Sequence, residues 1–276
     1  MICFPNAKIN IGLNVIEKRE DGYHNIESIF YPIHWCDALE VLPSEGSGKL
    51  DLAILGMPVP GSAESNLCTK VYNLLHEKYL LPSLKLWLLK CIPMGAGLGG
   101  GSSDAAFFLT LLNDFFKLNL SYDELKIYSS TIGSDCTFFL DNKPASITGK
   151  GDISMPIELD LSNYYISIVY PAIHVDTKNA YSLITPKKSS YSLKETILNL
   201  PVYKWKEKVI NDFESPVFAA YPELANIKKM IYDKGALYVS MTGSGSALYG
   251  IFEEKPDLED IFPEYKVWTA SIKKAL

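Results

Sequence analysis

Hydrophobic residues recur along the chain with two different periods, and these periods predict a mixture of strands and helices. From residue 8 to residue 15 every second position is apolar, as in a β-strand that buries one face. Similar patterns predict further strands at 38–42, 49–55, 84–92, 145–151, 164–170, 238–241 and 247–252. Helical spacing and capping residues predict helices at 65–79, 102–116, 121–132 and, interrupted by prolines, 211–233.

The pattern restarts after Met155-Pro156, and this break predicts two domains, residues 1–156 and 157–276. Within the second domain, residues 186–207 are polar, contain several lysines and show no clear period. We therefore expect a mobile connection there. No internal repeat or low-complexity segment is visible in the sequence.

Five glycines lie within residues 95–101, directly after a predicted strand and directly before an apolar helical run. Glycine permits positive φ and close approach of a ligand to backbone N–H groups. Ser102, Ser103 and Asp104 are residues typical of a helix start, so we expect the helix to begin there. A glycine loop followed by a helix N-terminus predicts a site for phosphate or polyphosphate.

Other glycine-rich loops fit this stretch less well. The spacing of Gly95, Gly97 and Gly100 satisfies the dinucleotide fingerprint, but a second helix follows where that motif requires a parallel strand. The P-loop pattern and the catalytic loop of protein kinases are absent from the sequence. A purely structural turn is the remaining alternative, and three consecutive glycines are costly in chain entropy without a ligand.

Composition and charge narrow the class of protein. Hydrophobic residues make up 47% of the chain, the net charge is −6 and the pI is about 5.3, so a general nucleic-acid binder is not expected. The five cysteines have no Cys-x-x-Cys pair, which is typical of a reducing compartment and argues against a disulfide framework or a zinc site. No signal peptide or membrane-spanning run is visible, and we expect a cytoplasmic protein that binds no membrane.

Two polar groups have open interpretations from the residues alone. Lys8 and Asn10 alternate on the polar face of the first strand, where they could hold an anion and a hydroxyl or simply face solvent. Asp135 lies between a glycine turn and an apolar run. Its pattern alone favours a helix N-cap, and the other interpretation is a carboxylate that points into a site beside a lysine.

Five motifs in order carry a resemblance to a known family. They are Ala7-Lys8-Ile9-Asn10 with Asp21-Gly22-Tyr23-His24, Pro93–Ala106, Gly133–Phe139, Thr177 with Tyr181, and Thr242–Ser246. Pro93–Ala106 resembles the ATP-binding motif of the galactokinase, homoserine kinase, mevalonate kinase and phosphomevalonate kinase superfamily. The five motifs together resemble the 4-diphosphocytidyl-2-C-methyl-D-erythritol kinases of the non-mevalonate isoprenoid pathway, and they span nearly the full chain.

The resemblance implies a role for each matching residue. The implied catalytic residues are Lys8 and Asp135, with Asp135 as the base. The implied ATP-binding residues are Pro93, Met94, Gly95, Ala96, Gly97, Leu98, Gly99, Gly100, Gly101, Ser102 and Ser103. The implied substrate-binding residues are Asn10, Tyr23, His24, Thr177 and Tyr181. Tyr181 stands where the family usually has Phe, which keeps an aromatic ring for stacking on cytosine. A supporting glycine loop is implied at Gly243, Ser244 and Gly245, where the residues alone favour a hairpin turn.

The resemblance also implies the fold and the reaction. We expect a two-domain α+β kinase fold with the active site in the cleft between the domains, and a ferredoxin-like C-terminal domain. The expected reaction is ATP-dependent phosphorylation of the 2-hydroxyl of 4-diphosphocytidyl-2-C-methyl-D-erythritol, with Mg²⁺ as cofactor. The alternatives are a mevalonate- or homoserine-kinase-like enzyme and a non-catalytic nucleotide-binding homologue. Metal ligands and the choice between monomer and homodimer are left open by the sequence.

Overall fold

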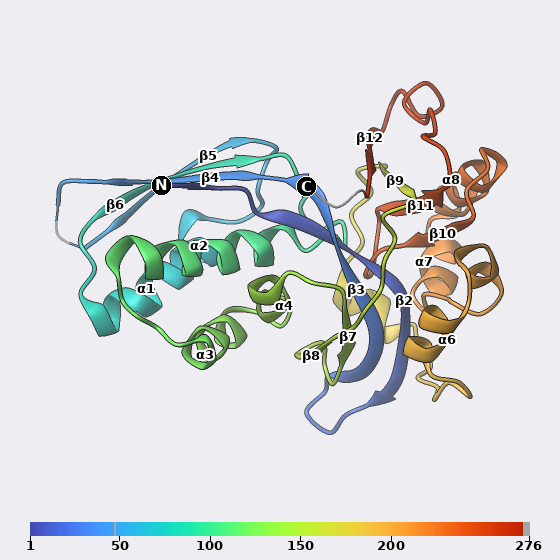
Figure 1. The fold of residues 1–276 in the computed structure, drawn as a ribbon, viewed down its shortest axis with the longest axis horizontal. Helices are drawn as coiled ribbons and strands as arrows, with labels where there is room; N and C mark the ends of the chain where they lie inside the picture. Colours follow the sequence, from blue (N-terminus) through green and yellow to red (C-terminus); the bar gives the residue numbers. More distant parts are fainter. Residues whose placement is uncertain (47, 273–276) are drawn as a thin grey trace. The chain divides into compact units, whose positions relative to one another are not determined.

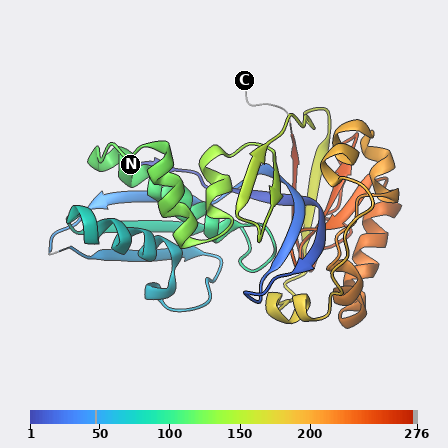
Figure 2. The same ribbon diagram turned by 90° about the horizontal axis from the view of Figure 1, so that it is seen from below.

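The computed structural model describes residues 1–46 and 48–272, and the chain divides into two compact units. Unit 1 consists of Met1–Ala7, Trp35–Met94 and Gly99–Lys143. Unit 2 consists of Lys8–His34, Gly95–Leu98 and Pro144–Leu276. The predicted division of the sequence at residue 156 stays a prediction. Figures 1 and 2 show the ribbon from two directions.

Unit 1 contains a four-stranded sheet with helices along one face (Figure 1). The strands are β1 (Ile2–Cys3), β4 (Ala38–Pro43), β5 (Leu50–Gly56) and β6 (Leu84–Lys90), in the order β1-β4-β6-β5. β5 and β6 are parallel, and the other neighbours are antiparallel. The helices are the 3-10 helix η1 (Ala63–Ser65) and α1 (Leu67–Tyr79), α2 (Gly100–Phe116), α3 (Tyr122–Ile132) and α4 (Cys136–Asp141).

Helices α1 and α3 begin at the caps expected from the sequence. The side chain of Asn66 accepts a hydrogen bond from the Cys68 N–H at 2.9 Å, at the start of α1. Ser121 and Glu124 form both halves of a capping box at the start of α3. These local contacts explain why the two helices are predictable from short stretches of sequence.

Helix α2 begins earlier than expected, and the prediction of a start at Ser102–Asp104 is wrong by two residues. The helix starts at Gly100, after Gly99 in a left-handed conformation with φ of +71°. Ser102 therefore lies in the first turn, and Asp104 lies beyond it in a buried position. The helix begins before the capping residue types, so its first turn consists largely of glycine and serine.

Unit 2 contains most of a second sheet, which carries the N-terminal motif. Its strands are β2 (Asn6–Lys18), β3 (His24–Cys36), β7 (Ala145–Thr148) and β8 (Ile153–Pro156), in the order β2-β3-β7-β8. The alternation at residues 8–15 correctly predicts a strand. The expectation of a half-buried strand is wrong, because the polar residues Lys8, Asn10 and Asn14 are also buried.

The third sheet lies wholly in unit 2. Its strands are β9 (Tyr165–Tyr170), β10 (Tyr238–Met241), β11 (Leu248–Phe252) and β12 (Lys266–Ser271), all antiparallel in the order β10-β11-β9-β12. Numbered along the chain within this sheet, the order is 2-3-1-4, which is the ferredoxin-like arrangement. Residues 253–265, between its last two strands, contain turns and no assigned helix.

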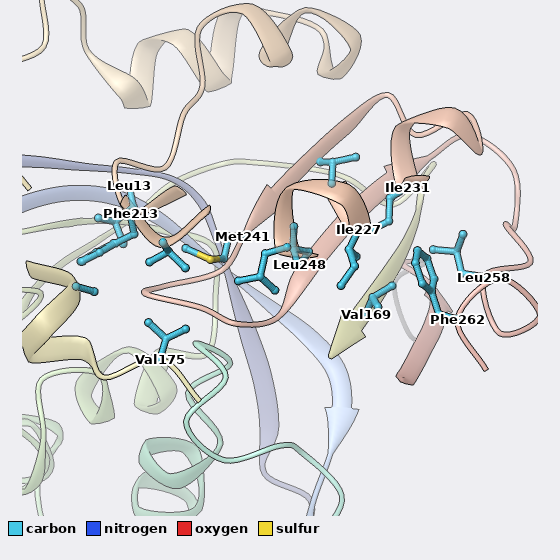
Figure 3. Packing of buried hydrophobic residues seen from close by; sticks show 14 of the residues in the cluster. Leu13, Val169, Val175, Phe213, Ile227, Ile231, Met241, Leu248, Leu258 and Phe262 are labelled. Carbon is cyan, nitrogen blue, oxygen red and sulfur yellow. The ribbon is translucent and has the colours of Figure 1, made fainter. Parts of the chain in front are cut away.

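The helices of unit 2 pack on this third sheet and on β2. They are α5 (Thr177–Ser182), α6 (Leu193–Asn199), the 3-10 helix η2 (Val202–Glu207), α7 (Glu214–Ala220) and α8 (Pro222–Asp233). Figure 3 shows the buried cluster in which Ile227 and Ile231 of α8 meet Val169 of β9 and Leu248 of β11. Burial of these aliphatic side chains, at about 25 cal/mol per Å² of apolar surface, holds the layer together.

The expectation of a mobile connection at 186–207 is wrong for its second half. α6 and η2 occupy most of residues 193–207, and four apolar side chains anchor them. The buried residues are Leu193, Ile197, Val202 and Trp205. Trp205 also donates its indole N–H to the Leu200 carbonyl at 2.9 Å. Lysines lie between these four apolar residues in the sequence, so the helical spacing of the apolar residues was not recognised.

The mixture of sheets and helices in both units confirms the α+β fold class expected from the sequence. Within residues 1–46 and 48–272, no helix is both long and apolar enough to cross a bilayer.

Candidate active site

The middle of the glycine loop, residues 95–98, belongs to unit 2 and contacts two other predicted motifs there. The Lys8 N–H donates to the Leu98 carbonyl at 3.0 Å, and the Ala247 N–H donates to the Ala96 carbonyl at 3.3 Å. Gly97 has φ of +78°, and a Cβ built on it would lie 1.9 Å from the Thr242 carbonyl oxygen. Only glycine fits at this crossing of two backbones.

Lys8 and Asn10 form a buried polar pair on β2. The Lys8 ammonium donates to Asn10 Oδ1 at 2.5 Å and lies 4.2 Å from the centre of the Phe30 ring. Lys8 is 3% exposed and Asn10 is 2% exposed, so the interpretation of this strand face as solvent-facing is wrong. A buried lysine beside an amide and an aromatic ring is a residue type that suits contact with an anion.

Thr242 connects this pair to the two glycine loops. Its hydroxyl accepts from the Asn10 N–H at 3.1 Å and lies within hydrogen-bond distance of the Gly97 carbonyl (2.9 Å) and Asn10 Oδ1 (3.2 Å). A Cβ on Gly243, with φ of +57°, would lie 3.0 Å from the Gly97 Cα. The segment is a hairpin turn, as the residues predict, and it also packs against the middle of the glycine loop. Thr242 opens the motif Thr242–Ser246, but the sequence did not predict it as a site residue.

Helix α5 presents two of the predicted substrate residues. Thr177 and Tyr181 are four residues apart and therefore lie on one face of the helix. The Thr177 hydroxyl is 2.9 Å from the Ser244 hydroxyl, and Tyr181 stacks on His24 with centroids 4.9 Å apart and an interplanar angle of 15°. Two motifs from opposite ends of the chain thus form one aromatic surface.

The surroundings of His24 are basic and partly exposed. Burial, reinforced by the charge of Lys18, lowers the pKa of His24 below its usual value of 6.5. Tyr23 is 60% exposed, and the ammonium of Lys150 lies 5.2 Å from the centre of its ring. A neutral imidazole between cations and exposed rings suits a planar, anionic ligand such as a nucleotide.

In unit 1, the end of the glycine loop and the Asp135 segment lie close together. The positions of Gly133 and Ser102 show this approach, because a Cβ on Gly133 would lie 3.9 Å from Ser102 Oγ. Asp135 occupies the N-cap position of α4, as the pattern suggests, but its side chain makes no capping hydrogen bond. Ser134 donates to Asp135 Oδ1 at 3.3 Å. The carboxylate is therefore not engaged in holding the helix.

A buried cluster of charges beneath α2 was missed by the sequence analysis. The ammonium of Lys90 donates to a carboxylate oxygen of Asp37 and, at 2.6 Å, to Asp104 Oδ2. Asp37 Oδ1 also accepts from the N–H groups of Cys91 (2.5 Å) and Ile92 (2.8 Å). The ammonium nitrogen of Lys90 would lie 3.3 Å from a Cβ built on Gly100, so the cluster lies directly beside the first residue of α2. No local sequence signal indicates this cluster, because Lys90 lies on β6, Asp104 on α2 and Asp37 between β3 and β4.

Burial sets the protonation of this cluster. Burial raises the pKa of Asp104, and the ammonium of Lys90 opposes this rise. Burial lowers the pKa of Lys90, but the carboxylates of Asp104 and Asp37 outweigh it and raise that pKa above 10.5. Lys90 therefore stays charged at neutral pH and fixes the base of the first turn of α2.

The predicted site residues are thus distributed over both units. Unit 2 contains Lys8, Asn10, Tyr23, His24, Gly95, Ala96, Gly97, Leu98, Thr177, Tyr181, Gly243, Ser244 and Gly245. Unit 1 contains Pro93, Met94, Gly99, Gly100, Gly101, Ser102, Ser103 and Asp135. Within unit 1, the Ser103 side chain is fully buried, and a Cβ on Gly101 would lie 3.2 Å from Met94 Cε.

Comparison with known proteins identifies the family. The family model for the GHMP kinases N terminal domain matches residues 66–150, and that for the GHMP kinases C terminal domain matches residues 201–266. The 4-diphosphocytidyl-2-C-methyl-D-erythritol kinase of Parabacteroides distasonis is 48% identical over 274 residues, which cover 99% of this chain and 100% of that protein. The corresponding protein of Bacteroides thetaiotaomicron is 50% identical over 261 residues, covering 94% of this chain and 95% of that protein.

Solved structures agree with the sequence relatives. A crystal structure of 4-(cytidine 5'-diphospho)-2C-methyl-D-erythritol kinase superposes with a TM-score of 0.82 at 29% identity, covering 98% of both chains. A mevalonate kinase superposes with a TM-score of 0.74 at 15% identity, covering 98% of both chains, which shows a shared fold. This chain therefore belongs to the 4-diphosphocytidyl-2-C-methyl-D-erythritol kinases within the GHMP kinases, and it is a phosphotransferase.

Proposed function

We propose that this chain transfers the γ-phosphoryl group of ATP to the 2-hydroxyl of 4-diphosphocytidyl-2-C-methyl-D-erythritol. The observation that supports it most directly is the stack of His24 on Tyr181, carried by the same unit as the Lys8–Asn10 pair. Stacked aromatic rings are a common platform for a nucleobase. The family relation supplies the kinase activity, and this platform favours an acceptor alcohol that carries cytidine.

The glycine loop would hold the phosphates of ATP. Gly95, Gly97 and Gly99 adopt left-handed conformations that bulky residues avoid, and the absence of a side chain at these positions permits close approach of a phosphate to the backbone. The first turn of α2 adds unpaired N–H donors and the positive end of the helix dipole. Lys90, buried below that turn, is matched by two carboxylates and so acts mainly as a support.

Asp135 would act as the base toward the attacking hydroxyl, and Lys8 would offset negative charge on the transferred group. An aspartate with a pKa near about 4 is a weak base for an alcohol. This is sufficient because phosphoryl transfer has a loose transition state in which positioning and electrostatic stabilisation dominate. The Asp135 segment lies close to the end of the glycine loop, because a Cβ built on Gly133 would lie 3.9 Å from Ser102 Oγ.

Mg²⁺ would be held mainly by the phosphate oxygens of ATP. Among residues 1–46 and 48–272 there is no cluster of three or more His, Cys, Asp or Glu side chains placed to hold a metal ion. Mg²⁺ commonly binds nucleotides through phosphates, one or two carboxylates and several waters, so such a cluster is not required. The ion would neutralise charge on the phosphates when bound.

The cytidine would be recognised by Tyr23, His24 and the α5 residues Thr177 and Tyr181. The 4.9 Å separation of His24 and Tyr181 leaves no room for a third ring between them. A cytosine would therefore stack on an outer face of this pair or displace one of its rings.

Because the cysteines are unpaired, we also infer a reducing compartment, the cytoplasm.

An ADP-release assay with three alcohols tests the proposed reaction. Mg-ATP would be incubated with 4-diphosphocytidyl-2-C-methyl-D-erythritol, mevalonate or homoserine. Turnover confined to the cytidylated alcohol is the expected result. Turnover with either of the other alcohols alone would overturn the substrate and keep the kinase. ADP from none of them, with ATP shown to bind, would favour a non-catalytic nucleotide-binding protein.

The role of Asp135 is tested by replacing its carboxylate. We expect Asp135→Asn to lower kcat by several powers of ten while the affinity for ATP is kept, since the substitution leaves the phosphate loop intact. Asp141→Asn, at the other end of α4, is the matched control and should leave kcat unchanged. Wild-type turnover by the Asp135 variant would refute its assignment as base.

A further inference from the structure

The segment Asn211–Glu214 precedes and opens α7 and carries three polar side chains with separate partners. Asn211 is 3% exposed, and its amide Nδ2 donates to the carbonyls of Met241 (2.7 Å) and Gly243 (2.9 Å). Its Oδ1 accepts from the Phe213 N–H at 3.0 Å. One side chain thus holds two carbonyls on either side of Thr242.

The same segment is joined to β2, the strand that carries Lys8 and Asn10. The Leu13 N–H donates to the Ile210 carbonyl at 2.9 Å, and the Asp212 N–H donates to the Leu13 carbonyl at 2.8 Å. The Asp212 carboxylate accepts from the Val15 N–H at 2.7 Å. Asn211 is therefore fixed with respect to β2 by backbone pairing on both sides of it.

Apolar packing fixes the segment from its other side. Leu13, Phe213 and Met241 belong to one buried cluster, drawn in Figure 3. Glu214 accepts from the Met241 N–H at 2.8 Å and pairs with Lys228 at 2.6 Å. Met241, the last residue of β10, is therefore held by Glu214, by Asn211 and by apolar packing. Gly243, two residues further along, is held by Asn211 through its carbonyl.

A continuous series of hydrogen bonds leads from Asn211 to Lys8. Asn211 holds the carbonyls around Thr242, whose hydroxyl accepts from the Asn10 N–H and lies 2.9 Å from the Gly97 carbonyl. Asn10 Oδ1 in turn accepts from the Lys8 ammonium at 2.5 Å. Rotation of the Met241–Thr242 or Gly243–Ser244 peptide, whose carbonyls Asn211 holds, would shift the Thr242 hydroxyl relative to Asn10 and Gly97.

We propose that Asn211 is a positioning residue for phosphoryl transfer, which holds the Thr242–Gly243 backbone so that Thr242 orients Asn10 and the Gly97 peptide. The amide group is required because two carbonyls face it and both need a donor. A carboxylate of the same shape offers none and would repel them. This inference rests on the proposed function insofar as Lys8 and the glycine loop act on ATP and Asn10 binds the acceptor.

If Asn211 had only a structural role, its replacement would lower stability without lowering kcat in the folded protein. A matched control variant separates a positioning role from a structural role. Tyr238 donates to the Val209 carbonyl at 3.2 Å, so Tyr238→Phe removes one buried hydrogen bond between β10 and the chain just before Asn211. It leaves the Thr242 turn untouched. Both variants should be compared at a temperature where urea unfolding curves show that each is fully folded.

The expected results differ in kind. For Asn211→Asp we expect kcat to fall by about tenfold or more, the equivalent of one to two lost positioning hydrogen bonds, with a smaller change in the KM of the acceptor. For Tyr238→Phe we expect reduced stability and unchanged kcat. Thr242→Val should reproduce the loss of kcat, and Thr242→Ser, which keeps the hydroxyl, should restore it.

Affinity for Mg-ATP, measured without any acceptor, makes the test independent of the proposed substrate. Asn211→Asp should weaken it by several-fold through the Gly97 peptide, even if the wild-type protein phosphorylates none of the three alcohols. In that case the proposed reaction fails and the ATP measurement alone decides this inference. Folded Asn211→Asp with wild-type kcat and ATP affinity would overturn it, as would an equal loss in Tyr238→Phe. If Asn211→Asp does not fold, the Thr242 pair decides by the same criteria.

Discussion

The crossing of Gly97 and Thr242 gives a sharp test of the glycine loop. Gly97→Ala adds one methyl group at a position where φ is +78° and where the Thr242 carbonyl oxygen would be 1.9 Å from the new Cβ. Ordinary van der Waals contact begins at 3.4 Å, so the two backbones must separate by about 1.5 Å. The atom in the way is backbone and cannot rotate aside.

Gly95→Ala is the matched control, because it shares the backbone strain without the collision. Its φ is +66°, and nothing lies within 4 Å of the added Cβ. Both variants should lose about 1–2 kcal/mol from placing alanine in the left-handed region. Gly97→Ala should lose about 2 kcal/mol more, because separation breaks the two hydrogen bonds of the Thr242 hydroxyl, at about 1 kcal/mol each.

Urea unfolding of the two variants measures this difference, and kcat/KM for ATP measures its functional counterpart. If about 1.4 kcal/mol of the extra loss falls on the transition state, Gly97→Ala should lose about tenfold more kcat/KM than Gly95→Ala. Equal unfolding free energies for the two variants would refute the reasoning. So would a fully active Gly97→Ala enzyme, since the loop would then tolerate the displacement.

Three further predictions concern the charged and aromatic groups. Lys90→Met should lower the free energy of unfolding by about 3–5 kcal/mol, because it leaves the carboxylates of Asp37 and Asp104 buried without a cation; a loss below about 1 kcal/mol in urea unfolding would contradict this. Tyr181→Phe should keep the KM of the cytidylated alcohol, because the aromatic ring is retained. Tyr181→Leu should raise this KM by about tenfold, the effect of losing one base-stacking ring. Equal KM values for the two variants would show that stacking is not used. Because burial lowers the pKa of His24 below its usual value of 6.5, its ring is neutral at pH 7. The same KM should therefore be constant from about pH 7 to 8 and rise only at lower pH, once the ring becomes protonated; a transition above pH 7 would contradict the assignment.

Much of the fold could be predicted because its signals are local. The capping box at Ser121 and the alternation along β2 each depend on residues within a few positions, so the chain itself specifies them. The glycine stretch likewise marks its own backbone conformation, with Gly95, Gly97 and Gly99 at positive φ. The start of α2 was misplaced by two residues, because a helix that begins with glycines has no capping residue type to mark its start.

The helices at residues 193–207 could not be predicted, for a different reason. Their propensity is weak, and they are stabilised by burying Leu193 and Trp205 against other elements. A sequence pattern shows that these side chains are apolar but not that a surface exists to receive them. Tertiary packing decided that this segment is ordered.

The sequence by itself determined many of the strands and helices, the place of the glycine loop and the family to which the chain belongs. The tertiary structure decided which polar residues meet. It buried Lys8 against Asn10, paired Lys90 with Asp37 and Asp104, and directed Asn211 at the carbonyls around Thr242. Local patterns arise from the chemistry of neighbouring residues, whereas most of these contacts join residues far apart in the sequence. Lys90 and Asp37 are 53 positions apart, and Asn10 and Thr242 are 232 positions apart. Packing selects them because a buried polar group must find a partner wherever the fold provides one.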